Sequence, residues 1–571
     1  MDQLVECVPN ISEGRDRAVI DAVVAAAADV EGVRLLDVAP GADTNRTVIT
    51  LLGPPDAVAE AAFRLVRRAG ELIDMRRHRG AHPRHGSTDV VPFVPVRGVS
   101  MDDCVALARA VGRRIGEELG FPVYLYEAAA TRDDRRNLAH VRQGEYEALP
   151  RKLGSDAGRP DFGPNEWNDR TARSGAINVG ARGFLVAYNV NLNTRQKRIA
   201  NQIALDVKEA GRARRDEAGR VVKDAEGQTV RVPGPYRLEA CKAVGWLLPE
   251  FDRAQVSMNL VDTAVTKPHQ AFEACRASAR DRGVRVTGSE LVGLVPEADL
   301  LEAGRHYLRR AGESAGVPRR MLLETAVQSL GLRDLGPFDP AERVLEYRAG
   351  LIDGRLASMT NRAFVDELST DAPAPGGGSV AALSGAQAAA LVAMVANLTV
   401  GKKGYEAVQE RVKTIAEEAQ ALKDALLEAM DLDTAAFDWV MAAFAEPKAT
   451  DEQRRARDLA IAEATRGATR VPLSVLERAD RVLELAAEVA EIGNANSLSD
   501  AGVAVLCAAA AAEGAYYNVR INLAALEGLD GSAEPDFVAS ARKRAIDGLE
   551  ACEAKATAAR RAIRGRLEVA G

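Results

Sequence analysis

Aromatic residues and cysteines are scarce in this chain of 571 residues. Phe, Trp and Tyr make up only 4% of it, but hydrophobic residues make up 47%, so large cores are possible. The six cysteines are scattered and form no CxxC pair, which argues against a zinc site or a disulfide framework and suits a reducing cytosol. Basic residues are not in excess, and the net charge of −7 argues against a nucleic-acid-binding protein.

Long apolar runs are also absent. No stretch of about 18 purely apolar residues occurs, and the best candidate, Ala386–Val395, is short and Ala-rich, which predicts a buried helix. The N-terminus, MDQLVECVPN, lacks a basic region followed by an apolar core, so a secretory signal is not expected. We therefore expect a cytoplasmic protein without a membrane span.

The first half alternates short β-rich runs with helical patterns. Up to residue 95 the order is strand, helix, strand, strand, helix, strand, which predicts a ferredoxin-like βαββαβ unit. A second pass of the same order begins near residue 183. We predict two α/β subdomains, over residues 1–180 and 181–334, with an exposed polar loop at 212–235.

The pattern changes in the second half. Residues 335–360 contain several Gly and Pro residues and predict a linker, after which strands disappear. In residues 406–441 apolar side chains recur at steps of three and four, which defines one buried helical face. We predict an all-α helical bundle over residues 361–571.

Residues 75–89, MRRHRGAHPRHGSTD, predict a loop rich in His and Arg between a helix and a strand. Its side chains include His78, His82, His85 and Arg84. Three interpretations are open: a metal site on the histidines, a solvated basic surface, or acid/base catalysis by one histidine with arginines that hold carboxylates. Gly80 and Pro83 disfavour the regular helix that would align ligands. Chemistry alone does not choose among the three histidines.

In the second half the most informative residue is Asp433. The apolar stripe of its predicted helix runs through Leu426 and Met430 to Phe437, so Asp433 falls on the buried face. Asp431 is displaced by about 200° and should lie nearer solvent. Because an unpaired buried carboxylate is costly, Asp433 is either a salt-bridged core residue or a functional group.

Residues 375–382, PGGGSVAA, lead into a predicted helix. Glycines before a helix N-terminus can present backbone N–H groups to an anion, although flexible linkers have a similar composition. The residues concerned are Gly376, Gly377, Gly378 and Ser379.

Several motifs together resemble the family of bifunctional formimidoyltransferase-cyclodeaminases. In the first half they are VECVPNISEG at 5–14, DTNRTV at 43–48, HPRHGSTDVVPFVPVRGVS at 82–100, VYLYEAA at 123–129, GEYEALPRKL at 144–153, PDFGP at 160–164 and GSELVGLVP at 288–296. In the second half they are APGGGSVAA at 374–382, NLTVGKK at 397–403, DLDTAAF at 431–437, IGNANSLSDAGVA at 492–504 and GAYYNVRINL at 514–523. The motifs are collinear over nearly the whole chain, so the resemblance is specific.

This resemblance implies two consecutive reactions. The first half would transfer a formimino group from N-formimino-L-glutamate to tetrahydrofolate. The helical half would cyclise 5-formiminotetrahydrofolate to 5,10-methenyltetrahydrofolate with release of ammonia. The resemblance implies His82 as the transferase base and Asp433 as the acid of the second site. Arg84, one of the arginines able to hold a carboxylate, is expected to contact substrate. A polyglutamated folate, a homo-oligomer and the absence of a metal are also expected.

The family's folate-binding segment matches residues 163–172, which read GPNEWNDRTA here and depart from the animal sequences. The predicted contacts are Gly163, Pro164, Asn165, Glu166, Trp167, Asn168, Asp169, Arg170, Thr171 and Ala172. Trp167 either packs in the fold or stacks on the pterin. In the helical half, further polar residues either line the cleft or serve as caps: Asn494, Ser499, Asp500, Asn518 and Asn522. The alternative functions are a folate-binding transferase whose helical half only oligomerises, and an enzyme with the transferase alone active.

Overall fold

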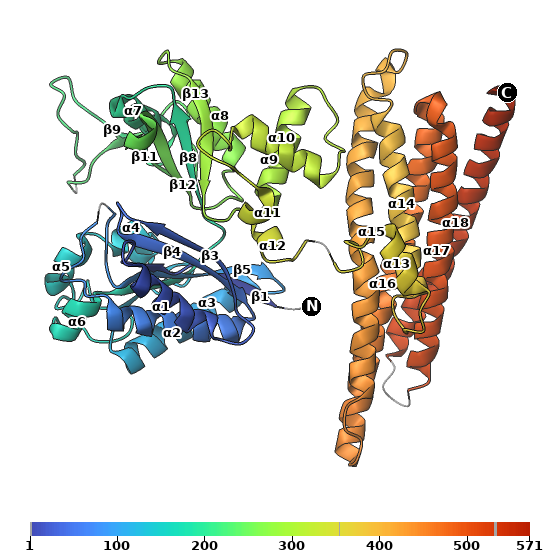
Figure 1. Cartoon of the computed structure of the whole chain (residues 1–571), viewed down its shortest axis with the longest axis horizontal. Helices are drawn as coiled ribbons and strands as arrows, with labels where there is room; N and C mark the ends of the chain where they lie inside the picture. Colours follow the sequence, from blue (N-terminus) through green and yellow to red (C-terminus); the bar gives the residue numbers. More distant parts are fainter. Residues whose placement is uncertain (1–2, 81, 226, 353, 530–533, 571) are drawn as a thin grey trace. The chain divides into compact units, whose positions relative to one another are not determined.

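The computed structural model describes residues 3–80, 82–225, 227–352, 354–529 and 534–570 (Figure 1). The chain divides into two compact units, Met1–Ala303 with Val327–Gly350 and Gly304–Ala326 with Leu351–Gly571. The first unit combines sheets with helices, and the second consists of long helices. The predicted change from α/β to all-α architecture is therefore confirmed.

The first sheet has seven strands in the described part of the chain. They are β1 (Leu4–Cys7), β2 (Asn10–Ile11), β3 (Arg34–Gly41), β4 (Arg46–Gly53), β5 (Thr88–Arg97), β6 (Val123–Glu127) and β7 (Ile177–Ala181). Their order is β1-β4-β2-β5-β7-β6, with β3 paired to β4. Strands β5, β7 and β6 are parallel, so the segments that precede them meet at one edge of the sheet.

Three helices lie together on one side of this sheet (Figure 1): α1 (Arg17–Ala28), α2 (Pro55–Leu72) and α3 (Met101–Arg114). Their starts follow known capping rules, because Asp16 caps α1, Pro55 begins α2 and Ser100 forms a capping box on α3. Shorter helices between β6 and β7 are α4 (Leu138–Val141), α5 (Glu145–Lys152) and α6 (Asp169–Ser174).

The second sheet is antiparallel, in the order β11-β12-β8-β13. Its strands are β8 (Val186–Leu192), β11 (Cys241–Leu248), β12 (Arg253–Leu260) and β13 (Val286–Val292), accompanied by α7 (Lys197–Val207) and α8 (Pro268–Arg280). Where a plain loop was predicted at 212–235, the chain forms a small hairpin of β9 (Arg212–Ala213) and β10 (Arg231–Val232). The prediction missed it because its strands are two residues long and exposed or partly exposed. The helices α9 (Glu297–Arg310), α10 (Arg319–Leu330), α11 (Pro340–Arg343) and α12 (Leu345–Arg348) follow.

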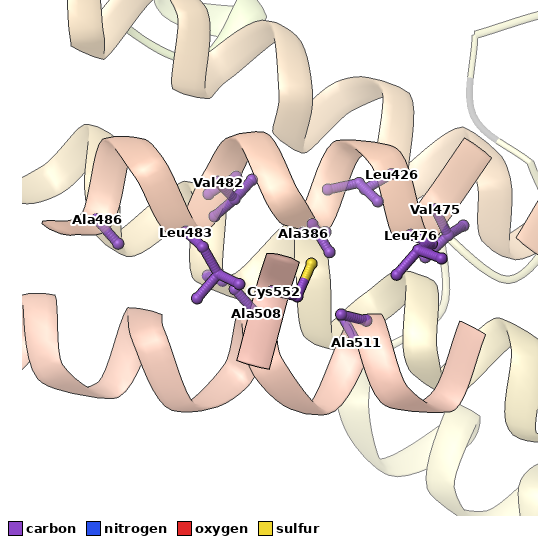
Figure 2. Close-up of a cluster of buried hydrophobic side chains, with 14 of the residues drawn as sticks. Ala386, Leu426, Val475, Leu476, Val482, Leu483, Ala486, Ala508, Ala511 and Cys552 are labelled. Carbon is purple, nitrogen blue, oxygen red and sulfur yellow. The ribbon is translucent and has the colours of Figure 1, made fainter. Parts of the chain in front are cut away.

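The helical unit contains α13 (Asn361–Leu368), α14 (Gly377–Asn397), α15 (Gln409–Phe444), α16 (Asp451–Ile492), α17 (Leu498–Glu527) and α18 (Pro535–Ala570). In its core, alanines such as Ala386 and Ala508 pack with larger side chains such as Leu426 and Leu476 (Figure 2). Small side chains let the helices approach closely, and the leucines fill the remaining space. By length and composition, Gly377–Asn397 and Ala495–Glu527 would pass as membrane spans, yet both supply residues to this core.

Candidate functional site

The loop rich in His and Arg, residues 75–87, is called the histidine loop below. It precedes β5 and lies at the edge of the sheet where the parallel strands begin. The backbone N–H of Ser87 donates to the carbonyl oxygen of Ser174 at 2.7 Å, and Gly86 bridges Gly175. A Cβ on Gly86 would lie 2.4 Å from the carbonyl oxygen of Ala176, so only glycine fits there. The loop is thus held against the segment that leads into β7.

His82 is partly buried in this loop. Its Nδ1 lies 2.5 Å from the carbonyl oxygen of Pro83. A carbonyl only accepts hydrogen bonds, so Nδ1 carries the proton and Nε2 is left as the basic nitrogen. Burial and the nearby Arg46 lower the pKa of His82 to about 4, against the opposing effect of Asp89. The imidazole is therefore neutral near pH 7 and able to accept a proton.

Asp89, the second residue of β5, joins two arginines beside His82. Its side chain is fully buried, and its Oδ2 pairs with both Arg46 and Arg142. Burial opposes ionisation of Asp89, but the two guanidinium groups outweigh it and lower the pKa to about 2. The Nε of Arg46 also donates to Asn10 Oδ1 at 3.0 Å. The sequence analysis did not identify this cluster. The feature that could have indicated it is a charged residue at the start of each of two apolar strands, Arg46 in β4 and Asp89 in β5.

The other two histidines of the loop have separate partners. His85 is fully buried, with Nδ1 3.2 Å from Asn178 Oδ1, and burial lowers its pKa to about 3. His78 is buried with Nε2 2.7 Å from the carbonyl oxygen of Asn45. Within the described ranges, no group of three or more His, Cys, Asp or Glu side chains is arranged to hold a metal.

Arg84 connects the histidine loop to the predicted folate segment through Tyr146. Its guanidinium pairs with Glu147 at 2.6 Å and lies 4.8 Å from the centre of the Tyr146 ring. The Tyr146 hydroxyl donates to the carbonyl oxygen of Ala172 at 2.5 Å. Trp167 packs edge-on against the same ring at 5.6 Å, which favours the packing interpretation of this tryptophan.

The rest of the segment forms the entry to α6. Asn168 caps this helix and Thr171 is buried, whereas Asn165, Glu166, Asp169 and Arg170 are exposed. Gly163 has a φ of +83°, and a Cβ there would lie 2.2 Å from the carbonyl oxygen of Phe121. Pro164 is partly exposed. The structure therefore spreads the ten predicted contacts between core and surface.

An arginine-lined cavity adjoins this segment. Its volume is about 340 Å³, and it is lined by Arg67, Gly70, Glu71, Leu119, Phe121, Arg170, Arg173 and Ser174. Glu71 pairs with Arg68 at 2.8 Å. In the described part of the chain, no carboxylate forms an ion pair with Arg67, Arg170 or Arg173. This cavity therefore suits an anionic group.

In the helical unit, Asp433 on α15 faces Ser379 in the first turn of α14. Ser379 Oγ lies 3.2 Å from Asp433 Oδ2, and the Ser379 backbone N–H also bonds to this carboxylate. Burial raises the pKa of Asp433, and both hydrogen bonds oppose this rise. Among the residues described, no Lys or Arg forms an ion pair with Asp433, which disfavours the salt-bridged alternative.

The three glycines differ in how closely they approach this carboxylate. A Cβ on Gly378 would lie 2.1 Å from Asp433 Oδ1, whereas one on Gly377 would meet only Asn518 Nδ2, at 3.8 Å. Gly376 is the N-cap residue of α14 and makes no side-chain cap. Asp433 can therefore approach the start of α14 only because Gly378 has no side chain.

Asp431 was predicted to lie nearer solvent than Asp433, and in the structure both residues are partly buried. Asp431 is partly buried, and its two oxygens accept from the backbone N–H groups of Leu356 at 2.8 Å and Ala357 at 3.2 Å. The segment that enters the helical unit covers this side of α15, which periodicity alone does not indicate. Asp431 thus anchors this segment of the chain to α15.

The other polar candidates do not gather around Asp433. Asn494 pairs with Lys402 near the C-terminal end of α14. Since α14 has 21 residues, that end lies about 30 Å from the glycines. Asn522 donates to the carbonyl oxygen of Ala468 at 2.9 Å, and Ser499 and Asp500 belong to the first turn of α17. Asn518 alone of the five is close to the glycine loop.

Comparison with known proteins covers both units. Family models match residues 4–182 (formiminotransferase domain, N-terminal subdomain), 187–350 (formiminotransferase domain) and 360–543 (formiminotransferase-cyclodeaminase). The formimidoyltransferase-cyclodeaminase of Rattus norvegicus is 42% identical over 530 residues, covering 92% of this chain and 93% of its own. The glutamate formimidoyltransferase of Streptococcus pyogenes serotype M1 is 42% identical over 54% of this chain and 94% of its own.

A relative of the helical half carries a different name. The methenyltetrahydrofolate cyclohydrolase of Methylorubrum extorquens is 45% identical over 190 residues, covering 33% of this chain and 88% of its own. The match to the rat protein covers most of both units, and the three family models are collinear along the chain. This chain belongs to the formimidoyltransferase-cyclodeaminase family.

Proposed function

We propose that the first unit transfers the formimino group from N-formimino-L-glutamate to tetrahydrofolate. The helical unit then cyclises 5-formiminotetrahydrofolate to 5,10-methenyltetrahydrofolate and releases ammonia. The full-length relative is named for both activities, and a bacterial relative of the first half for the transfer alone. The observation that carries the proposal is that each unit has its own proton-handling side chain: a neutral imidazole, His82, in the first, and in the helical unit Asp433, a carboxylate without a cationic partner among the described residues.

In the transfer, N5 of tetrahydrofolate attacks the amidine carbon of the donor. His82 Nε2 takes the proton that N5 loses and delivers it to the glutamate nitrogen as the bond to that nitrogen breaks. The low pKa of His82 ensures that Nε2 is unprotonated before substrate binds. Proton transfer of this kind is worth about 10²–10⁴-fold in rate, so positioning must supply the remainder.

In the cyclisation, N10 attacks the formimino carbon already bonded to N5, and the exocyclic nitrogen leaves as ammonia. Asp433 is suited to carry the N10 proton to that nitrogen, because its raised pKa makes the protonated state accessible. As a carboxylate without a cationic partner among the described residues, it also stabilises the cationic formimino group.

The arginine-lined cavity suits the carboxylates of a folate tail, since three of its arginines lack a carboxylate partner in the described ranges. A polyglutamate tail held there would keep the intermediate bound between steps and raise its effective concentration. We expect a shorter lag before methenyl product with polyglutamated than with monoglutamated folate. Equal lags would contradict this role of the tail. We also expect a homo-oligomer located in the cytoplasm.

For the architecture we propose two ferredoxin-like subdomains at 1–180 and 181–334, a linker at 335–360 and a helical domain at 361–571. The strand pairings support this division. In each sheet the first strand of the unit lies between its third and fourth, as β3-β4-β1-β5 and β11-β12-β8-β13. That order is expected for βαββαβ units.

Two reciprocal variants test the proposed function. His82→Ala should abolish formimino transfer yet leave the conversion of supplied 5-formiminotetrahydrofolate, and Asp433→Ala should do the reverse. The measurements are the near-ultraviolet absorbance of the methenyl product and free ammonia. If Asp433→Ala leaves both unchanged, the helical half serves assembly rather than catalysis.

The cyclohydrolase relative gives the helical half a second candidate activity. Water would add to the methenyl carbon, and the ring would open to 10-formyltetrahydrofolate. Supplying 5,10-methenyltetrahydrofolate instead of the formimino compound separates the two activities. Loss of methenyl absorbance faster than the uncatalysed rate, abolished in Asp433→Ala, would favour the hydrolytic activity.

A further inference from the structure

Two arginines share one carboxylate beside His82. The side chains of Arg46 and Arg142 are 12% and 19% exposed, and both guanidinium groups pair with Oδ2 of Asp89, which is fully buried. Two positive charges against one negative charge leave a surplus of one positive charge. The neighbouring ionisable groups do not offset it, because burial keeps the imidazoles of His82 and His85 neutral.

Among the described residues, Tyr126 and Lys152 do not supply a negative charge either. Burial raises the pKa of Tyr126, which faces both arginines, to about 12, so its phenol is neutral. Lys152, which faces His85, adds to the positive potential. A buried positive charge without a counter-charge is costly, and a bound anion would remove that cost.

Two buried hydrogen-bond acceptors of the cluster, Oδ1 of Asp89 and Nε2 of His85, lack a partner in the described part of the chain, and a donor group of a ligand, not its carboxylate, would satisfy them. By contrast, the buried Arg135 of the same subdomain pairs with Asp161 at 2.5 Å, one cation to one anion. The Arg135–Asp161 pair is therefore balanced in charge, whereas the Asp89 cluster is not.

We propose that Arg46 and Arg142, held in place by Asp89, bind the α-carboxylate of the amino-acid substrate next to His82. This inference rests on the proposed function, since it assigns a subsite for the formimino donor. Guanidinium groups recognise carboxylates through paired, charge-assisted hydrogen bonds. In N-formiminoglutamate three bonds separate the α-carboxylate carbon from the formimino carbon, so this anchor would hold the reacting carbon close to the imidazole.

Binding of the donor carboxylate to these arginines would also change the pKa of His82. The positive charge of Arg46 contributes to the low pKa of His82. A bound carboxylate would offset that charge and raise the pKa of His82 towards its ordinary value. A stronger base would then be present when the donor is bound, as general-base catalysis near neutral pH requires.

Arg142→Gln tests the subsite by steady-state kinetics of the transfer. We expect the KM for formiminoglutamate to rise at least tenfold, the KM for tetrahydrofolate to change less than twofold, and Arg142→Lys to restore part of the loss. The matched control is Arg132→Gln, which removes an exposed arginine paired with Asp134 at 2.9 Å and should change neither KM. A rise in the KM for tetrahydrofolate alone, or equal rises for both substrates, would overturn the assignment.

Inhibition of the unmodified protein gives a test that does not depend on how the variants fold. N-formyl-L-glutamate should compete with the donor, and N-formyl-L-isoglutamine, whose α-carboxylate is an amide, should bind at least tenfold more weakly. N-formyl-L-glutamine keeps the α-carboxylate and should lose less affinity than the isoglutamine compound. Equal inhibition by the glutamate and isoglutamine compounds would refute the subsite. If the unmodified protein forms no 5-formiminotetrahydrofolate at all, the proposed function fails instead.

Discussion

Adjacent glycines at the start of α14 should respond very differently to alanine. A Cβ at residue 378 would lie 2.1 Å from Asp433 Oδ1 and 2.5 Å from both Cγ and Oδ2, whereas one at residue 377 would meet only Asn518 Nδ2 at 3.8 Å. We predict that Gly378→Ala removes most of the cyclodeaminase activity and that Gly377→Ala keeps it within about twofold of the parent.

The magnitude follows from the displacement. Ordinary contact begins at 3.4 Å, so the carboxylate must retreat by 3.4 − 2.1 = 1.3 Å. A misplacement of about 1 Å at a reacting group can cost about 10²-fold in rate. Stability should not fall in parallel, because alanine is a better helix former than glycine by about 1 kcal/mol, which offsets part of the steric strain.

The assay supplies 5-formiminotetrahydrofolate and follows methenyl absorbance and ammonia, with formimino transfer measured on the same preparations as an internal control. Both variants should retain transfer, since residues 377 and 378 belong to the helical unit. Full cyclodeaminase activity in Gly378→Ala, or an equal loss in Gly377→Ala, would show that the contact with Asp433 does not determine the activity.

Three further outcomes are expected. Ser379→Ala removes a hydrogen bond that lowers the pKa of Asp433, so the acid limb of the cyclodeaminase pH–rate profile should move to higher pH; an unmoved limb would exclude Asp433 as the titrating base. His85 has a folded pKa of about 3 against an ordinary 6.5, so the unfolded state binds more protons between these values and stability falls as pH drops. The His85 contribution to this loss between pH 6.5 and 5 should be about 2 kcal/mol, measured by denaturant titration as the difference between the parent and His85→Gln. Gly70→Ala places a Cβ 2.4 Å from the Phe121 ring, so it should narrow the arginine-lined cavity and reduce any preference for polyglutamated folate, measured as the ratio of KM values.

Local patterns were sufficient to predict most elements. The order predicted up to residue 95 is found as β1, α1, β3, β4, α2 and β5, because the alternation of strands and the capping of helices depend on residues within each segment. Strand β7 was not predicted. Its sequence, INVGA, is short and contains glycine, and its parallel partners β5 and β6 are supplied by distant parts of the chain.

The features of the candidate sites differ in the same way: those that depend on one segment could be predicted, and those that depend on packing between segments could not. Helical periodicity alone indicated that Asp433 faces inward, since that depends on its own helix. Its contact with Gly378 depends on how α14 packs on α15, which no periodicity encodes. The cluster of Arg46, Asp89 and Arg142 joins three segments separated by 43 and 53 residues, so only the folded sheet brings them together.

The two sites have opposite electrostatic character, and this difference favours one direction of transfer. Around His82 the surplus charge is positive, which suits the carboxylates of the donor; once the formimino group is bonded to N5 it no longer has the α-carboxylate beside it, so the positive charge disfavours the cationic group there. Asp433 has no cationic partner in the described ranges, so its site favours that same cation. Under the proposed function, the first site therefore binds the donor but does not retain the product, and the second site stabilises the product until ammonia leaves. Raising the ionic strength should weaken binding of the charged donor at the first site more than it slows cyclisation at the second. At the second site the formimino group is already bonded to N5 of the bound folate, so no free ion has to be drawn from solution. Equal salt sensitivity of the two steps would contradict this division of charge.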